Sequence, residues 1–166
     1  MNVAIIMGSD SDWSVMKSAV DTLKSFDVEV SVTIASAHRT PDKVREFVTN
    51  SDAQIFIAAA GMAAHLAGVV ASLTTKPVIG VPMNSEPFKG LDALLSTVQM
   101  PGGVPVATMA VNGAKNAALF AVEILALADD ELAKKLTVYR HKLVTEVALK
   151  EQKIQQSLHE YIQHCF

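Results

Sequence analysis

Short apolar runs alternate along this chain with segments in which hydrophobic residues recur at the spacing of a helix. The runs end at glycine or at polar residues, as strands do. They predict five strands, over Val3–Met7, Val28–Ile34, Ile55–Ala60, Pro77–Val81 and Val104–Val111. The intervening segments predict helices around Met16–Leu23, from Pro41 with Thr40 as N-cap, and over Ala64–Leu73, Leu91–Gln99 and Ala114–Ala128.

Most of these strands are apolar throughout, although Val28–Ile34 alternates strictly with polar residues. Continuous apolar strands are typical of a sheet that is covered on both faces, and their alternation with helices indicates parallel pairing. The pattern therefore predicts a three-layer α/β/α sandwich around a mostly parallel, five-stranded sheet. We expect one domain over residues 1–166, with an α/β core at about 1–128 and a helical tail at about 129–166.

The tail has its own hydrophobic pattern. One apolar stripe comprises Leu132, Leu136, Tyr139 and Leu143, and it resumes at Ile154, Leu158 and Ile162. A helix extending beyond the core needs something to cover this stripe. Another subunit would cover it, and so would a helix that folds back on its own domain; the sequence alone leaves both open.

Composition narrows the class of protein. Half of the 166 residues are hydrophobic and 19% are charged, which suits a buried core and excludes disorder. The net charge of -3 argues against a strongly basic nucleic-acid binder. No apolar run is long enough to span a membrane, Met1–Met7 lacks the basic start of a signal peptide, and the single Cys165 excludes an internal disulfide framework. We expect a cytoplasmic protein that assembles into a homo-oligomer.

Small and polar residues gather where the predicted strands end. These segments are Gly8–Asp12, Ser36–Pro41, Gly61–His65 and Pro82–Ser85. In open parallel sheets, ligands bind outside the carboxyl ends of the strands. The position of these segments therefore predicts a binding site at this edge.

The first of these segments can bind a nucleotide without a nucleotide-binding motif. Gly8-Ser9-Asp10-Ser11 precedes a helix, so its amides and hydroxyls can hold a phosphate, while Asp12 can accept hydrogen bonds from ribose. It is neither a Walker A loop nor a dinucleotide fingerprint. The alternative is that Ser11 or Asp12 merely caps the helix.

Histidines supply the candidate acid–base chemistry. The imidazole of His38 can exchange a proton near neutral pH, and Arg39 beside it can bind phosphate or carboxylate. His65, among alanines, fits a packed residue as well as a catalyst. The tail residues His141, His159 and His164 have no metal-ligand spacing, so we expect no metal site.

Four motifs, in order from Met7 to about Leu127, resemble the PurE family, and within it class I, the N5-carboxyaminoimidazole ribonucleotide mutases of purine biosynthesis. They are Met7-Gly8-Ser9-x-Ser11-Asp12, Ser36-Ala37-His38-Arg39-Thr40-Pro41, Ala60-Gly61-x-Ala63-Ala64-His65-Leu66, and Gly90-Leu91-Asp92-Ala93-Leu94-Leu95-Ser96-x-Val98-Gln99-Met100-Pro101.

The resemblance implies a flavodoxin-like fold, a homo-octamer, and an isomerase that uses no cofactor and moves a carboxyl group from N5 to C4 of an aminoimidazole ribonucleotide. It implies His38 as general acid and base, and Ser9, Asp12 and Arg39 as substrate-binding residues. Further contacts are expected from Gly8, Ser11, Ser36, Ala37, Gly61, Ala63, Ala64 and His65.

Two positions depart from the pattern: Met62 stands where the family often has glycine, and Ala67 where it often has proline. These departures bear on the shape of the loop. Two other functions stay open at this point. One is a carboxylase of the same family that uses free CO2, and the other is a non-catalytic, flavodoxin-like nucleotide-binding module.

Overall fold

The computed structural model describes residues 1–164, so Cys165 lies outside the described residues. The chain divides into two compact units, Met1–Leu125 and the segment from Ala126 onward. In the first unit, five parallel strands form one sheet in the order β2-β1-β3-β4-β5. The strands are β1 (Asn2–Met7), β2 (Glu29–Ile34), β3 (Ile55–Gly61), β4 (Val78–Met83) and β5 (Ala107–Thr108).

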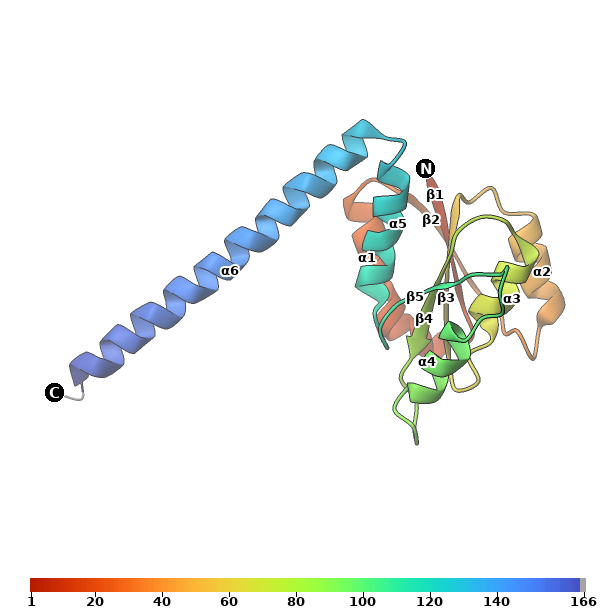
Figure 1. The fold of residues 1–166 in the computed structure, drawn as a ribbon, viewed down its shortest axis with the longest axis horizontal. Coiled ribbons are helices and arrows are strands. Elements are labelled where there is room, and N and C mark those ends of the chain that lie inside the picture. The colour runs from red at the N-terminus through yellow and green to blue at the C-terminus, as the bar shows by residue number, and fades with distance from the viewer. Residues whose placement is uncertain (165–166) are drawn as a thin grey trace. The chain divides into compact units, whose positions relative to one another are not determined.

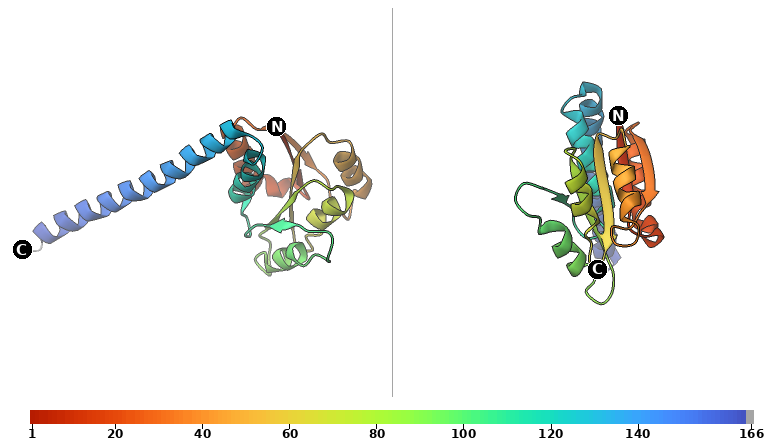
Figure 2. Two further views of the ribbon diagram at one scale, coloured as in Figure 1. Left: turned by 45° about the horizontal axis from the view of Figure 1, so that its top comes forward. Right: turned by 90° about the vertical axis from the view of Figure 1, so that its right-hand side faces the viewer.

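Helices cover both faces of this sheet (Figures 1 and 2). On one face lie α1 (Trp13–Ser25) and α5 (Ala114–Ala126), and on the other lie α2 (Pro41–Thr49), α3 (Leu66–Leu73) and α4 (Leu91–Val98). A short 3-10 helix, η1 (Asp10–Asp12), precedes α1. The arrangement confirms the predicted α/β/α sandwich and flavodoxin-like fold.

The apolar side chains of β1 are buried on both faces of the sheet. Ala4 and Ile6 of β1 join Phe56 of β3 in a cluster with α2 and α3, whereas Val3 and Ile5 are fully buried outside that cluster. Because successive side chains of a strand point to opposite faces, both faces of β1 are core. Burial on both faces explains why this strand shows no polar alternation.

The edge strand β2 differs from the central strands. Its apolar residues Val32 and Ile34 are 42% and 43% exposed, and Trp13 of α1 is 42% exposed. Together with Met7, Asp10 and Thr33 they line one shallow surface pocket. The alternating sequence thus forms a strand as predicted, but among residues 1–125 nothing fully covers its apolar side chains Val32 and Ile34.

The fifth strand is shorter than the prediction of Val104–Val111. Only Ala107 and Thr108 pair regularly with β4, although the amide of Met109 still donates to the Gly80 carbonyl at 2.9 Å. The carbonyl of Pro82 in β4 faces β5 and accepts the Asn112 amide at 2.8 Å. Proline has no N–H, so Pro82 cannot donate the next hydrogen bond to β5. The ladder therefore breaks after Thr108.

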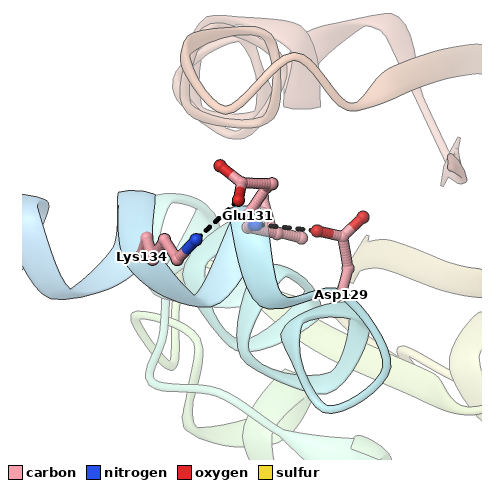
Figure 3. Close-up of polar contacts among 4 residues, drawn as sticks. Asp129, Glu131 and Lys134 are labelled. Atoms are coloured by element: carbon pink, nitrogen blue, oxygen red, sulfur yellow. Dashed lines mark hydrogen bonds and ion pairs between the residues drawn. The ribbon is translucent and has the colours of Figure 1, made fainter.

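The second unit contains one continuous helix, α6 (Asp130–His164). It confirms the prediction of an extended helical tail. Asp129 caps it, since its Oδ1 accepts the Leu132 amide at 2.8 Å, and Lys134 pairs with Glu131 at 2.6 Å (Figure 3). Its exposed large apolar side chains are Val138, Val144, Val147, Leu149, Ile154, Leu158, Tyr161 and Ile162. No helix within residues 1–164 has the length and apolar character to cross a bilayer.

Gly80 sets how closely the helices approach β4. A Cβ built there would lie 2.4 Å from Thr97 Cγ2 in α4, 3.0 Å from Val106 Cγ1 and 3.3 Å from Ala67 Cβ in α3. Thr97 is buried, and its hydroxyl donates to the Ala93 carbonyl at 2.8 Å, so it cannot move aside freely.

We expect Gly80→Ala to lower the free energy of unfolding by about 1–3 kcal/mol, as overpacking of a core does. Gly102→Ala is the matched control, because a Cβ at Gly102 meets nothing within 4 Å. Urea unfolding of the two variants measures the difference. Equal stabilities would contradict the close packing inferred at Gly80.

Candidate active site

A cavity of about 590 Å³ opens at the carboxyl edge of the sheet. The chain leaves β1 towards β2 on one side, while β3 lies on the other side of β1, so this edge holds the topological switch point of the sheet. The lining residues are Gly8, Ser9, Ser11, Asp12, Ser36, Ala37, His38, Arg39, Ala60, Gly61, Met62, Ala63, His65, Leu66, Met83, Asn84 and Ser85.

The loop after β1 is held by a reciprocal pair of side-chain bonds. The Ser9 hydroxyl accepts the Ser11 amide at 3.3 Å, and the Asp12 carboxylate accepts the Ser9 amide at 3.2 Å. In this capping box Ser9 is the N-cap of η1, whereas Asp12, at the N-cap position of α1, makes no side-chain hydrogen bond to that helix. Ser9, Ser11 and Asp12 nevertheless all line the cavity. Capping and ligand contact are therefore compatible here.

Burial of Asp12 costs the protein stability. The side chain is only 7% exposed, and this desolvation raises the pKa of Asp12 above its ordinary value of 3.8. Hydrogen bonds from Ser9 and Ser11 act in the opposite direction without cancelling the shift, and Asp10 adds to it. A buried carboxyl at the rim of a cavity, without a basic partner among these causes, is typical of a functional site.

Side-chain hydrogen bonds within the loop after β2 fix its conformation. The Thr40 hydroxyl accepts the Ser36 amide at 2.9 Å, and the Ser36 hydroxyl accepts the Arg39 amide at 3.2 Å. Thr40 is the N-cap of α2, as predicted, but its hydroxyl serves Ser36 rather than the helix amides. These bonds present His38 and Arg39 at the cavity. Arg39 Nη2 reaches across to donate to the Gly8 carbonyl at 3.2 Å.

The two histidines of the site meet. His38 Nε2 lies 2.9 Å from His65 Nδ1, and the rings are at 77° with centroids 5.0 Å apart. A hydrogen bond between two ring nitrogens requires one shared proton. His65 is thus exposed at the cavity rather than packed in the core. The structure joins two candidate acid–base groups that are distant in sequence.

The loop after β3 has a left-handed turn. Met62 has a φ of 56°, a conformation that costs a side chain other than glycine about 1–2 kcal/mol. Its amide donates to the Ser85 hydroxyl at 3.3 Å, and its carbonyl accepts the Ala64 amide at 2.9 Å. The Ala63 carbonyl accepts the His65 amide at 2.8 Å. These tight turns deliver His65 to His38.

Of the residues expected at the site, the structure brings all but one to the cavity. Ala64 is 1% exposed and does not line it, because its side chain points into the core beneath the loop. Asn84 and Ser85, which follow β4, also line the cavity. The sequence placed their segment, Pro82–Ser85, at this edge but assigned no role to either residue. Within residues 1–164, no three His, Cys, Asp or Glu side chains converge to hold a metal ion.

A family model described as AIR carboxylase matches residues 2–146. The chain belongs to the AIR carboxylase family. Among its relatives, the N5-carboxyaminoimidazole ribonucleotide mutase of Methanocaldococcus jannaschii is 56% identical over 154 residues, which cover 93% of this chain and 98% of the relative. The mutase of Thermotoga maritima is 50% identical over 157 residues, which cover 93% of this chain and 92% of the relative.

Solved structures agree with this assignment to the AIR carboxylase family. The crystal structure of Treponema denticola PurE superposes with a TM-score of 0.83 at 31% identity, covering 92% of this chain and 97% of that one. The resemblance of the four motifs to the PurE family is therefore confirmed. The loops that line the cavity lie inside the matched segment.

We expect Asp12→Asn to raise the free energy of unfolding relative to the wild type at neutral pH. Because the folded-state pKa is raised, the stability provided by the neutral carboxyl is complete below pH 3.8 and is lost as the pH rises through the raised value. The advantage of the variant should be small near about pH 4 and larger near about pH 7. Urea unfolding at both pH values measures it.

The opposite trend would show that the charge of Asp12 stabilises the fold. A relative stability of Asp12→Asn that falls as the pH rises would contradict the inferred cost of burial.

Proposed function

We propose that this protein is an N5-carboxyaminoimidazole ribonucleotide mutase of purine biosynthesis, an isomerase. The observation that carries the proposal is the agreement with mutases from two organisms, at 56% and 50% identity over 93% of the chain. The cavity supports it, since two histidines in contact and an arginine line one site. The substrate is a small molecule, the N5-carboxylated aminoimidazole ribonucleotide.

In the proposed site, the loop after β1 and Arg39 hold the ribose phosphate. The Asp12 carboxylate can accept hydrogen bonds from ribose hydroxyls, the Ser9 hydroxyl can donate to a phosphate oxygen, and the Arg39 guanidinium suits a phosphate. Gly8, Ser11, Ser36 and Ala37 supply backbone and small side chains nearby. Binding energy from this half of the ligand fixes the imidazole ring against His38.

The proposed reaction breaks and remakes one bond to carbon. The N-carboxylate loses CO2, and the aminoimidazole that remains is an enamine, nucleophilic at C4. C4 attacks the retained CO2. His38 then takes the proton from C4, which restores the aromatic ring, and a proton is returned to the exocyclic nitrogen. One imidazole can serve as base and then as acid, so this scheme needs no cofactor.

A carboxylase that uses free CO2 is the nearest alternative, and the family model that matches this chain is itself described as AIR carboxylase. The two activities differ in whether bicarbonate must be supplied. The wild-type protein should convert the N5-carboxylated ribonucleotide to the C4-carboxylated product without added bicarbonate. Product formed only from the uncarboxylated ribonucleotide with bicarbonate would overturn the mutase in favour of the carboxylase.

Replacement of His38 separates binding from chemistry in the same assay. His38→Asn should lower kcat by about 10²-fold or more, as the loss of a positioned acid–base group does, with little change in ligand affinity. Calorimetry with the product measures affinity, and circular dichroism controls for folding. Near-normal turnover would move the proton transfer to another group, with His65 the first candidate.

We also infer that the protein is a cytoplasmic homo-oligomer, and the family resemblance suggests an octamer. The exposed apolar residues Val32 and Ile34 on β2, and those along α6, support an assembly because a stable monomer would leave them in water. Light scattering should give a mass about eight times 17.7 kDa. A monomer whose mass does not change with concentration would contradict any assembly.

A further inference from the structure

Asn112 continues the sheet beyond the point at which Pro82 interrupts it. The amide of Asn112 donates to the Pro82 carbonyl at 2.8 Å, and its side-chain Oδ1 accepts the Asn84 amide at 2.9 Å. In a parallel ladder, one residue bonds in this way to the two neighbours of the residue opposite it. Asn112 therefore occupies the ladder position opposite Met83, with its side-chain oxygen in place of a backbone carbonyl.

The backbone of Asn112 explains why its side chain takes this part. Its φ is 58°, a left-handed conformation that asparagine adopts more readily than most residues. In this turn the backbone carbonyl of Asn112 accepts the Ala114 amide at 2.9 Å, at the start of α5, rather than the Asn84 amide. The side-chain oxygen supplies the acceptor that the end of β4 would otherwise lack.

The loop after β4 is anchored at both of its ends by the same segment. Asn84 begins the loop and is bonded to Asn112. Gly90 ends it with a φ of 86°, and a Cβ built there would lie 2.6 Å from Val111 Cγ1 and 3.3 Å from the Cα of Asn84. The loop therefore closes on Val111 and Asn112, and it carries Ser85 to the cavity.

Ser85 links this loop to the loop after β3. Its hydroxyl accepts the Met62 amide at 3.3 Å, at the left-handed turn from which the chain runs on to His65. His65 Nδ1 in turn lies 2.9 Å from His38 Nε2. Hydrogen bonds and short turns thus connect Asn112 to both histidines, although Asn112 itself is exposed and does not line the cavity.

We propose that Asn112 is a positioning residue for the two histidines: through Asn84 and Ser85 it fixes the loop after β3, and so holds His65 against His38. The inference rests on the proposed mutase function. The residues proposed to bind the ribose phosphate lie on the loops after β1 and β2, away from this path. Loss of the Asn112 contact should therefore affect the chemical step rather than ligand binding.

Three substitutions test this role in the mutase assay. Asn112→Gly keeps the left-handed turn and removes the acceptor, so kcat should fall about 10-fold or more, while affinity for the product, measured by calorimetry, changes little. Asn112→Asp keeps an oxygen acceptor and tolerates the turn, so it should retain most of the wild-type kcat. Asp27→Gly is the matched control, because Asp27 also has a φ of 58° but lies between α1 and β2, at the opposite edge of the sheet.

Ser85→Ala gives a second test, because it removes the acceptor of the Met62 amide. It should also lower kcat, and the double variant Asn112→Gly/Ser85→Ala should lose no more than about the larger single loss, since both changes break one path. Losses that multiply would overturn the proposal. A near-wild-type kcat in either single variant would do so too, and so would equal losses in Asn112→Gly and in Asn112→Asp or Asp27→Gly.

Hydrogen–deuterium exchange measures the same connection without activity. Mass spectrometry of the peptide covering residues 60–66 should show faster exchange in Asn112→Gly than in the wild type and in Asn112→Asp. Unchanged exchange there would overturn the proposal even where kcat falls. Melting temperatures show whether each variant folds, and Ser85→Ala carries the comparison if Asn112→Gly does not. A wild-type protein that forms no product would refute the proposed function, whereas the exchange measurement would still decide whether Asn112 holds the loop.

Discussion

The parallel pairing of β1 with β3 carries the whole site. Met7 lies opposite Ala59, and the amide of Gly8 continues the ladder by donating to the Ala59 carbonyl at 2.9 Å. The loop that begins at Ser9 therefore starts level with the end of β3. Because both faces of β1 are buried, a slip of one residue would exchange the side chains that pack on the two helix layers, and it would carry Ser9 away from its partners. The same register that buries Ile5 and Ile6 thus places the ligand-facing loops.

Two residues in these loops lower the stability of the fold. Asp12 is buried with a raised pKa, and Met62 adopts a left-handed backbone. Neither feature helps the fold by itself, since an exposed carboxyl or a glycine would remove the cost. Packing of the sheet against its helices offsets the free energy lost at these two residues. Both residues line the same cavity, so the departures from the most stable local choice coincide with the proposed chemistry.

The sequence predicted the parts of the site that depend on a single strand end. His38 and Arg39 follow β2 directly, and short-range bonds from Ser36 and Thr40 hold their loop, so their position follows from nearby residues. The contact of His38 with His65 spans 27 positions and depends on the turn at Met62, which no local pattern encodes. The early end of β5 could not be predicted for a similar reason. Whether the missing N–H of Pro82 falls on the β3 side or the β5 side of β4 depends on the register of the strands.

The histidine pair gives the proposed mechanism a simple proton balance. At 2.9 Å, the two facing nitrogens share one proton, because two N–H groups directed at each other would repel. With one proton between them and one on an outer nitrogen, both rings are neutral and the pair can accept one more. The proposed reaction removes one proton from C4 and returns one to nitrogen, so a pair that gains and then loses a single proton is restored after each turnover. A pair of this kind needs no exchange of protons with solvent within one turnover of the proposed reaction.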